Sequence, residues 1–337
     1  MTDRTPLIEG FLQAAGWADA ERKLLAGDAS NRRYDRLRKG DGQTAILMDA
    51  PPERGEDVRP FQQVAAYLSS AGLSAPKIYH ADPLYGLLLI EDLGDDLFAR
   101  LMAGDPALQE PLYRAAVDVL VQLHAAPLPD LPLCDAAWLV DMTAPAFEFY
   151  ATERQAQPSV PFSDAFGPLA QELDAAPKVV ILRDYHAENL LWLPERQRAA
   201  RVGLLDFQDA LMGHPAYDLV SILQDARRDV PPEIEAHMID YYVAQSGTDP
   251  DTFRRAYALL GAQRNLRILG IFARLCLRDG KAHYVDLIPR VWNHLENNLR
   301  HPALAPVARS IEGILPRPTP DFLEQLKSQC ASIPTPS

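Results

Sequence analysis

The sequence predicts an α+β protein with a small β-rich N-terminal lobe and a larger, mostly helical C-terminal lobe. Short apolar runs separated by turn residues fill residues 23–90, whereas long stretches with helical periodicity follow residue 110. A chain of 337 residues is also too long for one small core. We therefore expect lobes at residues 1–93 and 94–327, followed by a disordered tail at 328–337.

The N-terminal lobe should contain five strands and one inserted helix after a short leading helix. Pro60 suits the first turn of the inserted helix, and Gly72 suits its end. Phe61, Val64 and Leu68 fall on one stripe of that helix. The predicted helices are Leu7–Trp17 and Asp57–Ala71, and the strands are two within Lys23–Arg38, then Gly42–Asp49, Lys77–Ala81 and Gly86–Ile90.

The C-terminal lobe should begin with an amphipathic helix and then contain three short strands before a helical remainder. The apolar runs at residues 179–182, 190–192 and 202–205 predict the strands. The predicted helices are Glu110–His124, Ala216–Asp229, Pro232–Gln245, Pro250–Arg278 and His283–Leu299.

Three polar residues punctuate those short strands. Asp184 follows the first strand, Asn189 comes five positions later, and Asp206 follows the third strand. Phosphoryl transfer needs a carboxylate to orient and deprotonate the attacking hydroxyl, and it needs oxygen ligands for Mg²⁺. Asp184 suits the first role, and Asn189 and Asp206 suit the second. The alternative is a β-meander in which these residues only form turns.

The surrounding sequence resembles the aminoglycoside phosphotransferase and choline kinase superfamily, whose loop usually reads His-Gly-Asp-x-His-x-x-Asn. Leu182 and Arg183 replace the usual His and Gly, but Asp184, His186 and Asn189 remain. The segment Gly213-His-Pro-Ala-Tyr-Asp-Leu219 also matches, and by resemblance Asp218 starts a helix and holds the loop. Within the superfamily, the chain is most similar to the anomeric N-acetylmuramate/N-acetylglucosamine kinase group. The resemblance implies a protein-kinase-like two-lobe fold, ATP and Mg²⁺ as cofactors, and an amino sugar as substrate.

The predicted hairpin at residues 25–34 should cover the nucleotide phosphates. Its small residues allow backbone amides to approach phosphate oxygens, and its polar side chains Ser30, Asn31, Arg32 and Arg33 can donate hydrogen bonds. By resemblance, backbone groups of Glu91 and Leu93 bind the adenine edge. A plain surface hairpin and a solvated strand end remain the alternatives for these two segments.

One position departs from the usual kinase pattern. Met48 stands on the third strand where a phosphate-binding Lys is expected, and the following helix contains Gln62 and Gln63 but no Glu. Either Arg32 or Arg33 replaces the Lys, or the chain is a catalytically inactive nucleotide-binding fold. A choline- or aminoglycoside-type kinase is a further alternative.

Arginines recur at helical spacing on the predicted helix Pro250–Arg278. Arg264 and Arg267, with Arg183 beside the catalytic Asp, are candidates to bind an acidic acceptor such as N-acetylmuramate. A solvated helix face is the alternative for these arginines.

Composition narrows the classes of partner. The net charge of −13 and pI of about 5.1 argue against a nucleic-acid partner. No apolar run is long enough for a transmembrane helix, and the N-terminus lacks a signal-peptide core. The three cysteines are far apart in sequence and predict neither a disulfide framework nor a zinc site. These features favour a cytoplasmic protein that acts on a small molecule.

Overall fold

The computed structural model describes residues 4–26 and 31–334. The chain divides into two compact units. The first unit consists of residues 1–126 and 187–210, and the second consists of residues 127–186 and 211–337. The predicted boundary after residue 93 stays a prediction. Within the described residues, no helix is both long and apolar enough to cross a membrane.

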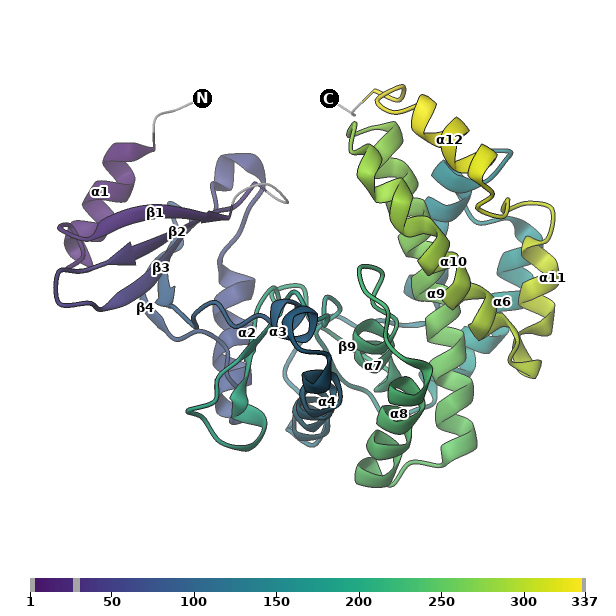
Figure 1. The fold of residues 1–337 in the computed structure, drawn as a ribbon, viewed down its shortest axis with the longest axis horizontal. Helices are drawn as coiled ribbons and strands as arrows, with labels where there is room; N and C mark the ends of the chain where they lie inside the picture. Colours follow the sequence, from purple (N-terminus) through teal and green to yellow (C-terminus); the bar gives the residue numbers. More distant parts are fainter. Residues whose placement is uncertain (1–3, 27–30, 335–337) are drawn as a thin grey trace. The chain divides into compact units, whose positions relative to one another are not determined.

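The first unit is built on a five-stranded antiparallel sheet with the order β1-β2-β3-β5-β4. Helix α1 packs on one face of this sheet (Figure 1), where Phe11 and Leu12 meet Leu37, Leu47 and Leu89. Because side chains alternate along a strand, Ile46 and Met48 of β3 lie on the opposite face. The elements are α1 (Thr5–Ala14), β1 (Glu21–Ala26), β2 (Arg33–Arg38), β3 (Thr44–Asp49), β4 (Ile78–Asp82) and β5 (Leu87–Glu91).

Helix α2 (Arg59–Ser70) is the inserted helix that the sequence predicts. Its Pro60 lies in the first turn, and Phe61, Val64 and Leu68 are buried. The chain leaves the helix through Gly72 at a φ of 75°, a conformation that glycine adopts without steric cost. The confirmed stripe fixes which face of α2 packs on the rest of the unit.

The remainder of the first unit carries the hairpin of β7 (Leu190–Trp192) and β8 (Val202–Leu204). A bridge from Ser74 to Gly203 and a bridge from Leu97 to Leu191 connect this hairpin to the preceding segments. The helices of this part are α3 (Phe98–Gly104) and α4 (Gln109–His124), with short 3₁₀ turns at Pro52–Arg54, Pro106–Leu108 and Arg198–Arg201.

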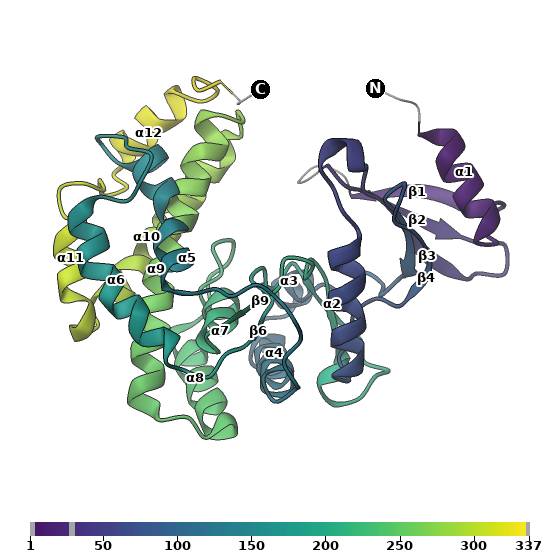
Figure 2. The ribbon, with the colours of Figure 1, turned by 180° about the vertical axis from the view of Figure 1, so that it is seen from behind.

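The second unit is mainly helical, and the long helix α9 (Pro250–Leu277) runs through it. Helix α10 packs along α9, and α6 and α11 lie beside them (Figure 2). Strands β6 (Val179–Ile181) and β9 (Leu211–Gly213) form a small antiparallel pair. The other elements are α5 (Ala136–Asp141), a π-helix at Ala146–Tyr150, α6 (Val160–Asp174), α7 (Ala216–Leu223), α8 (Pro232–Ser246), a 3₁₀ helix at Ala282–Leu287, α10 (Ile288–Leu299), a 3₁₀ turn at Pro302–Leu304, α11 (Ala305–Ile311) and α12 (Pro320–Ser328).

Three expectations need correction. Helix α7 ends at Leu223 instead of Asp229, because Gln224 leaves the helical conformation at φ −113° and ψ 50°. Asp218 lies inside this helix and is not its first residue. Residues 328–334 do not form the disordered tail that we expected, since the Ala331 and Ile333 amides donate to carbonyls at the end of α9 at 2.9 and 3.0 Å. Residues 335–337 of that tail lie outside the described residues.

Candidate active site

The first unit contains a pocket of about 590 Å³. Its walls come from the Ile46 face of the sheet, from the segment after β5 and from the β7–β8 hairpin. Its charged lining residues are Arg32, Arg36, Glu56, Glu91, Asp92, Asp206 and Asp209. This lining has five carboxylates and two guanidinium groups, so it is net negative. An anionic nucleotide would therefore bind favourably only together with a cation that offsets the repulsion.

Asn189 and Asp206 meet at the wall of this pocket, as the motif predicts. Asn189 precedes β7 and Asp206 follows β8, so pairing of the two strands brings the residues together. The Leu205 amide donates to the Asn189 carbonyl at 3.0 Å, and Asn189 Nδ2 lies 3.5 Å from Asp206 Oδ2. Gln208 Nε2 donates to the other carboxylate oxygen at 2.8 Å. The two predicted metal ligands therefore lie next to each other, with the Asn189 side-chain nitrogen near the Asp206 carboxylate.

This pair fits Mg²⁺ better than a metal held only by protein. Within the part of the chain that the structure describes, no group of three or more His, Cys, Asp or Glu residues could hold an ion. Mg²⁺ commonly takes one or two protein oxygens and completes its octahedron with water and phosphate. Asn189 and Asp206 would supply such a pair, and a bound ion would neutralise phosphate charge.

The predicted phosphate-binding residues have different surroundings in the structure, and they do not all line the pocket. Arg32 lines the pocket, where its Nε lies 2.6 Å from Glu56 Oε2. Burial opposes the charge of Arg32, but the hydrogen bond to Glu56 gives it a pKa above its ordinary value. Arg33 instead pairs with Asp35 at 3.0 Å and is half exposed. The Asn31 side chain donates from Nδ2 to the Arg54 carbonyl at 3.1 Å. Ser30 lies outside the described residues.

Glu56 is a pocket residue that sequence analysis missed. The kinase pattern predicts a Glu inside the inserted helix, but the residue that pairs with Arg32 lies between the Pro52–Arg54 turn and α2. Both side chains are mostly buried, at 14% and 13% exposed. The pocket thus contains an Arg–Glu ion pair, although Met48 of β3 is a buried apolar residue at 1% exposure.

The end of β5 and the segment that follows it contribute the predicted adenine-binding residues to the same pocket. Glu91 and Leu93 both line it. The Glu91 side chain is held by Arg196 at 2.6 Å, and its backbone continues the pairing of β5 with β3 through Ala45. Apolar walls from Ile46, Ile90 and Leu191 suit a flat aromatic base.

The loop that carries Asp184 belongs to the second unit, where Asp218 holds it. Asp218 is fully buried and accepts hydrogen bonds from the amides of Leu182 and Arg183 at 2.6 and 2.9 Å. Burial raises its pKa to about 7 in spite of these bonds. The amide of Asp184 itself donates to the Leu182 carbonyl at 2.8 Å. The predicted role of Asp218 in holding the loop is confirmed.

Arg183 has a φ of 69°, in the left-handed region where glycine is favoured. Its guanidinium lies 5.6 Å from the centre of the Trp138 ring, within cation–π range. The other acceptor candidates, Arg264 and Arg267, are half-buried on α9 in the same unit.

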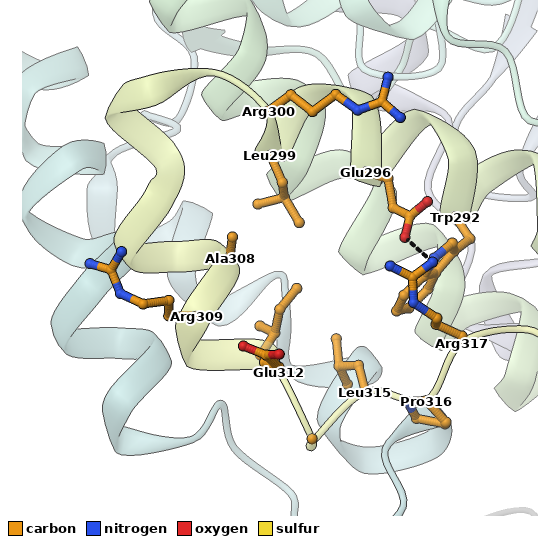
Figure 3. A pocket seen from close by; sticks show the side chains of 12 residues that line it. Trp292, Glu296, Leu299, Arg300, Ala308, Arg309, Glu312, Leu315, Pro316 and Arg317 are labelled. Atoms are coloured by element: carbon orange, nitrogen blue, oxygen red, sulfur yellow. Dashed lines mark ion pairs between the residues drawn. The ribbon is translucent and has the colours of Figure 1, made fainter.

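A second cavity of about 840 Å³ lies in the second unit (Figure 3). Residues of α10, of α11 and of the segment that follows them form it, and Arg317 pairs with Glu296 at 2.7 Å across it. None of the predicted site residues lines this cavity. Size alone therefore does not identify the active site of this protein.

The two-unit α+β fold and the Asn–Asp pair define a kinase-like phosphotransferase. Comparison with known proteins agrees, because residues 21–259 match the model of the phosphotransferase enzyme family. The chain belongs to this family. An N-acetylmuramate/N-acetylglucosamine kinase of Caulobacter vibrioides is 41% identical, over 90% of this chain and 94% of that protein. A protein of the same name from Pseudomonas putida is 34% identical, over 85% and 86%.

Solved structures support the fold. An amicoumacin kinase in complex with AMP-PNP and Ca²⁺ aligns with a TM-score of 0.61 at 16% identity, covering 88% of this chain and 94% of that one. A choline/ethanolamine kinase family protein from Mesorhizobium loti aligns with a TM-score of 0.60 at 14% identity, over 91% and 98%. These structures confirm the predicted fold class, as the family model and the curated relatives confirm the predicted family.

Proposed function

We propose that this protein transfers the γ-phosphoryl group of ATP to the anomeric hydroxyl of N-acetylmuramate or N-acetylglucosamine. The observation that carries the proposal is the approach of Asn189 to Asp206, 3.5 Å apart at the wall of the pocket. The names of the relatives at 41% and 34% identity supply the acceptor. ATP is made in the cytoplasm, so we place the reaction there, as a step in recycling cell-wall sugars.

In this proposal the pocket of the first unit holds the nucleotide. Backbone groups of Glu91 and Leu93 bind the adenine edge, and Arg32, oriented by Glu56, donates to the phosphates. Asn189 and Asp206 would hold Mg²⁺. When bound, that ion supplies positive charge where negative charge develops on the phosphoryl oxygens.

Asp184 would accept the proton of the acceptor hydroxyl. An anomeric hydroxyl is more acidic than an ordinary alcohol, so an ordinary carboxylate can serve as its base. A positioned base contributes roughly 10²–10⁴-fold to the rate. The hydrogen bonds from Leu182 and Arg183 to Asp218 fix the backbone next to Asp184 and so limit the positions that its carboxylate can take.

A catalytically inactive nucleotide-binding protein is the second candidate, and Met48 is the observation that favours it. A kinase normally places a Lys on this strand to bind phosphate. The Arg32–Glu56 pair supports activity instead, because a buried ion pair beside the pocket can supply the missing cation. A choline- or aminoglycoside-type kinase is less consistent with the arginines of α9, since those acceptors are cationic.

The experiment is to measure ATP consumption with N-acetylmuramate, N-acetylglucosamine, choline and an aminoglycoside. We expect turnover with the two amino sugars, and the position of the new phosphate follows from ³¹P NMR of the product. Asp184→Asn should bind ATP normally and lose roughly 10²–10⁴-fold in turnover. Nucleotide binding without consumption for any acceptor would support the inactive alternative. Normal turnover by the Asp184→Asn variant would reject the base assignment.

A further inference from the structure

Six arginines occupy α9 and its C-cap, and they divide into two groups. The three near the helix ends form ion pairs: Arg254 with Asp240, Arg255 with Glu172, and Arg278 with Asp279. The three central arginines do not. Among the described residues, no Asp or Glu forms an ion pair with Arg264, Arg267 or Arg274.

The unpaired central arginines are also half-buried. Removing a guanidinium group from water is unfavourable unless an anion compensates, and like charges near one another add to the cost. Burial and the neighbouring Arg278 and Arg267 lower the pKa of Arg274, and the carboxylates of Asp279 and Glu148 only partly offset that effect. A row of half-buried cations without carboxylate partners is therefore suited to an anionic ligand.

Tyr217 marks where such a ligand would lie. This tyrosine is on α7, which packs against α9 (Figure 1), and it is 1% exposed. Its hydroxyl has no hydrogen-bond partner among the described residues. Arg264, Arg267 and Arg183 are the cations that act on it electrostatically. Its ring also contacts Trp138, over which the Arg183 guanidinium lies.

The same cluster is connected to the loop of Asp184. Arg264 and Asp184 both act electrostatically on His186 and on Asp218, and Asp218 holds the Leu182 and Arg183 amides. An acceptor whose hydroxyl faced Asp184 would therefore extend its other substituents toward Arg264 and, one helical turn further along α9, toward Arg267.

We propose that Arg264 and Arg267, together with Arg183, bind the carboxylate of N-acetylmuramate and make it a better acceptor than N-acetylglucosamine. This inference rests on the proposed function. The two sugars differ by one lactyl ether, whose carboxylate is the only charge on either molecule. Arg267 is the specificity residue in this assignment, because Arg264 also lies near the buried Asp218 that positions the catalytic loop.

The test compares kcat/KM for both sugars in the wild type, in Arg267→Gln and in Arg267→Lys. Arg267→Gln should lose roughly 10- to 100-fold with N-acetylmuramate, the range for a hydrogen bond to a charged group, and should keep its rate with N-acetylglucosamine. Arg267→Lys should recover part of the loss, since it restores charge without the planar fork. The matched control is Arg255→Gln. Arg255 lies on the same helix but forms a surface ion pair with Glu172.

A neutral acceptor separates charge recognition from shape. The methyl ester of N-acetylmuramate keeps the lactyl group but removes its charge, so wild type and Arg267→Gln should use it equally well. Equal losses by Arg267→Gln on both amino sugars would show a structural role and overturn the proposal. An unchanged rate of this variant with N-acetylmuramate would overturn it as well.

Binding provides a readout that does not require turnover. Calorimetric titration of N-acetylmuramate into Asp184→Asn and into the Asp184→Asn/Arg267→Gln double variant should show weaker binding by the latter, by roughly 10- to 100-fold. If the wild type phosphorylated neither sugar, the proposed function would be lost, yet weaker binding by the double variant would still support the carboxylate site. Equal binding by the two proteins would reject that site.

Discussion

Two residues near the proposed chemistry hold backbone conformations that favour glycine. Arg183 has a φ of 69° and Asp206 a φ of 56°. Aspartate tolerates this region better than most residues, but arginine gains nothing from it. This chain accepts strain of about 1 kcal/mol to place a guanidinium at this position. The strain is understandable if the Arg183 side chain contacts the acceptor.

His214 gives a prediction about acid stability. It is 8% exposed, and its Nδ1 accepts a hydrogen bond from the Ala216 amide at 3.1 Å, which requires the neutral ring. Burial lowers its pKa from 6.5 to about 4, with a smaller effect from Lys178. Between these two values the unfolded chain binds a proton that the folded protein does not, so stability falls as the pH falls from 6.5 to 4. One pKa unit corresponds to about 1.4 kcal/mol, so the free energy of unfolding should fall by about 3 kcal/mol over this pH range.

His214→Asn should retain an acceptor for the Ala216 amide but cannot bind the proton. We therefore expect its urea unfolding midpoint to fall less than that of the wild type between pH 7 and pH 4.5. His283→Gln, at an exposed position, serves as the control and should follow the wild type. Parallel pH profiles for His214→Asn and the wild type would contradict the buried neutral histidine.

The sequence predicted which residues carry the proposed chemistry better than it predicted which residues pair with them. Asn189 and Asp206 were found from sequence because two short strands fix where their flanking residues fall, and strand pairing is local. Glu56 was missed because no periodic pattern places it. Its pairing with Arg32 joins residues 24 positions apart and depends on the path of the chain between β3 and α2.

At the scale of elements, packing decides where the sequence pattern is ambiguous. Amphipathic helices such as α2 and α4 were predicted within a few residues, because their apolar stripes are set by local spacing. The predicted helix His283–Leu299 begins as a 3₁₀ helix at Ala282–Leu287, and the α-helix α10 starts only at Ile288. The π-helix at Ala146–Tyr150 had no sequence signature, and it exists where this segment packs on α9.

Gly270 of α9 yields a prediction about that contact. A Cβ atom at this position would lie 2.0 Å from the carbonyl carbon of Pro145 and 2.3 Å from the Ala146 nitrogen, which are backbone atoms that cannot rotate away. Gly270→Ala should force α9 and the π-helix apart and destabilise the protein by about 3 kcal/mol, the upper range for overpacking. The measurement is the shift of the urea unfolding midpoint.

Gly10 of α1 provides the matched control, because a Cβ atom there would meet nothing within 4 Å. Gly10→Ala should be neutral or stabilising by about 0.5–1 kcal/mol, since alanine is the better helix former. An unfolding midpoint of Gly270→Ala as high as that of the wild type would show that the two elements do not pack this closely.

At the scale of the whole molecule, the proposed functions divide between the two units. The first unit carries the pocket, Arg32 and the predicted Mg²⁺ ligands, and the second carries Asp184 and the arginines of α9. The sequence predicted these roles because each depends on a short motif. It could not predict that residues 187–210 belong with the N-terminal part, because that grouping depends on long-range contacts such as the bridge between Ser74 and Gly203.

This division predicts that nucleotide binding and acceptor chemistry can be separated by substitution. A ligand that binds only the folded state stabilises it by about 2.7 kcal/mol at a hundred times its Kd. ATP should therefore raise the thermal unfolding temperature of the wild type, and more so with Mg²⁺, since the pocket lining has an excess of carboxylates. Asp184→Asn should show the same response, because its substituted residue belongs to the other unit.

Asp206→Asn should retain a shift with ATP but lose the increment that Mg²⁺ adds, because the proposed metal site would lose its carboxylate and keep only amide side chains. Asp240→Asn, whose carboxylate pairs with Arg254 at the surface, is the control and should respond as the wild type does. An undiminished Mg²⁺ increment in Asp206→Asn would remove this residue from the metal site. Loss of the whole ATP response in Asp184→Asn would mean that nucleotide binding is not confined to the first unit, and the two roles would not be separable by substitution.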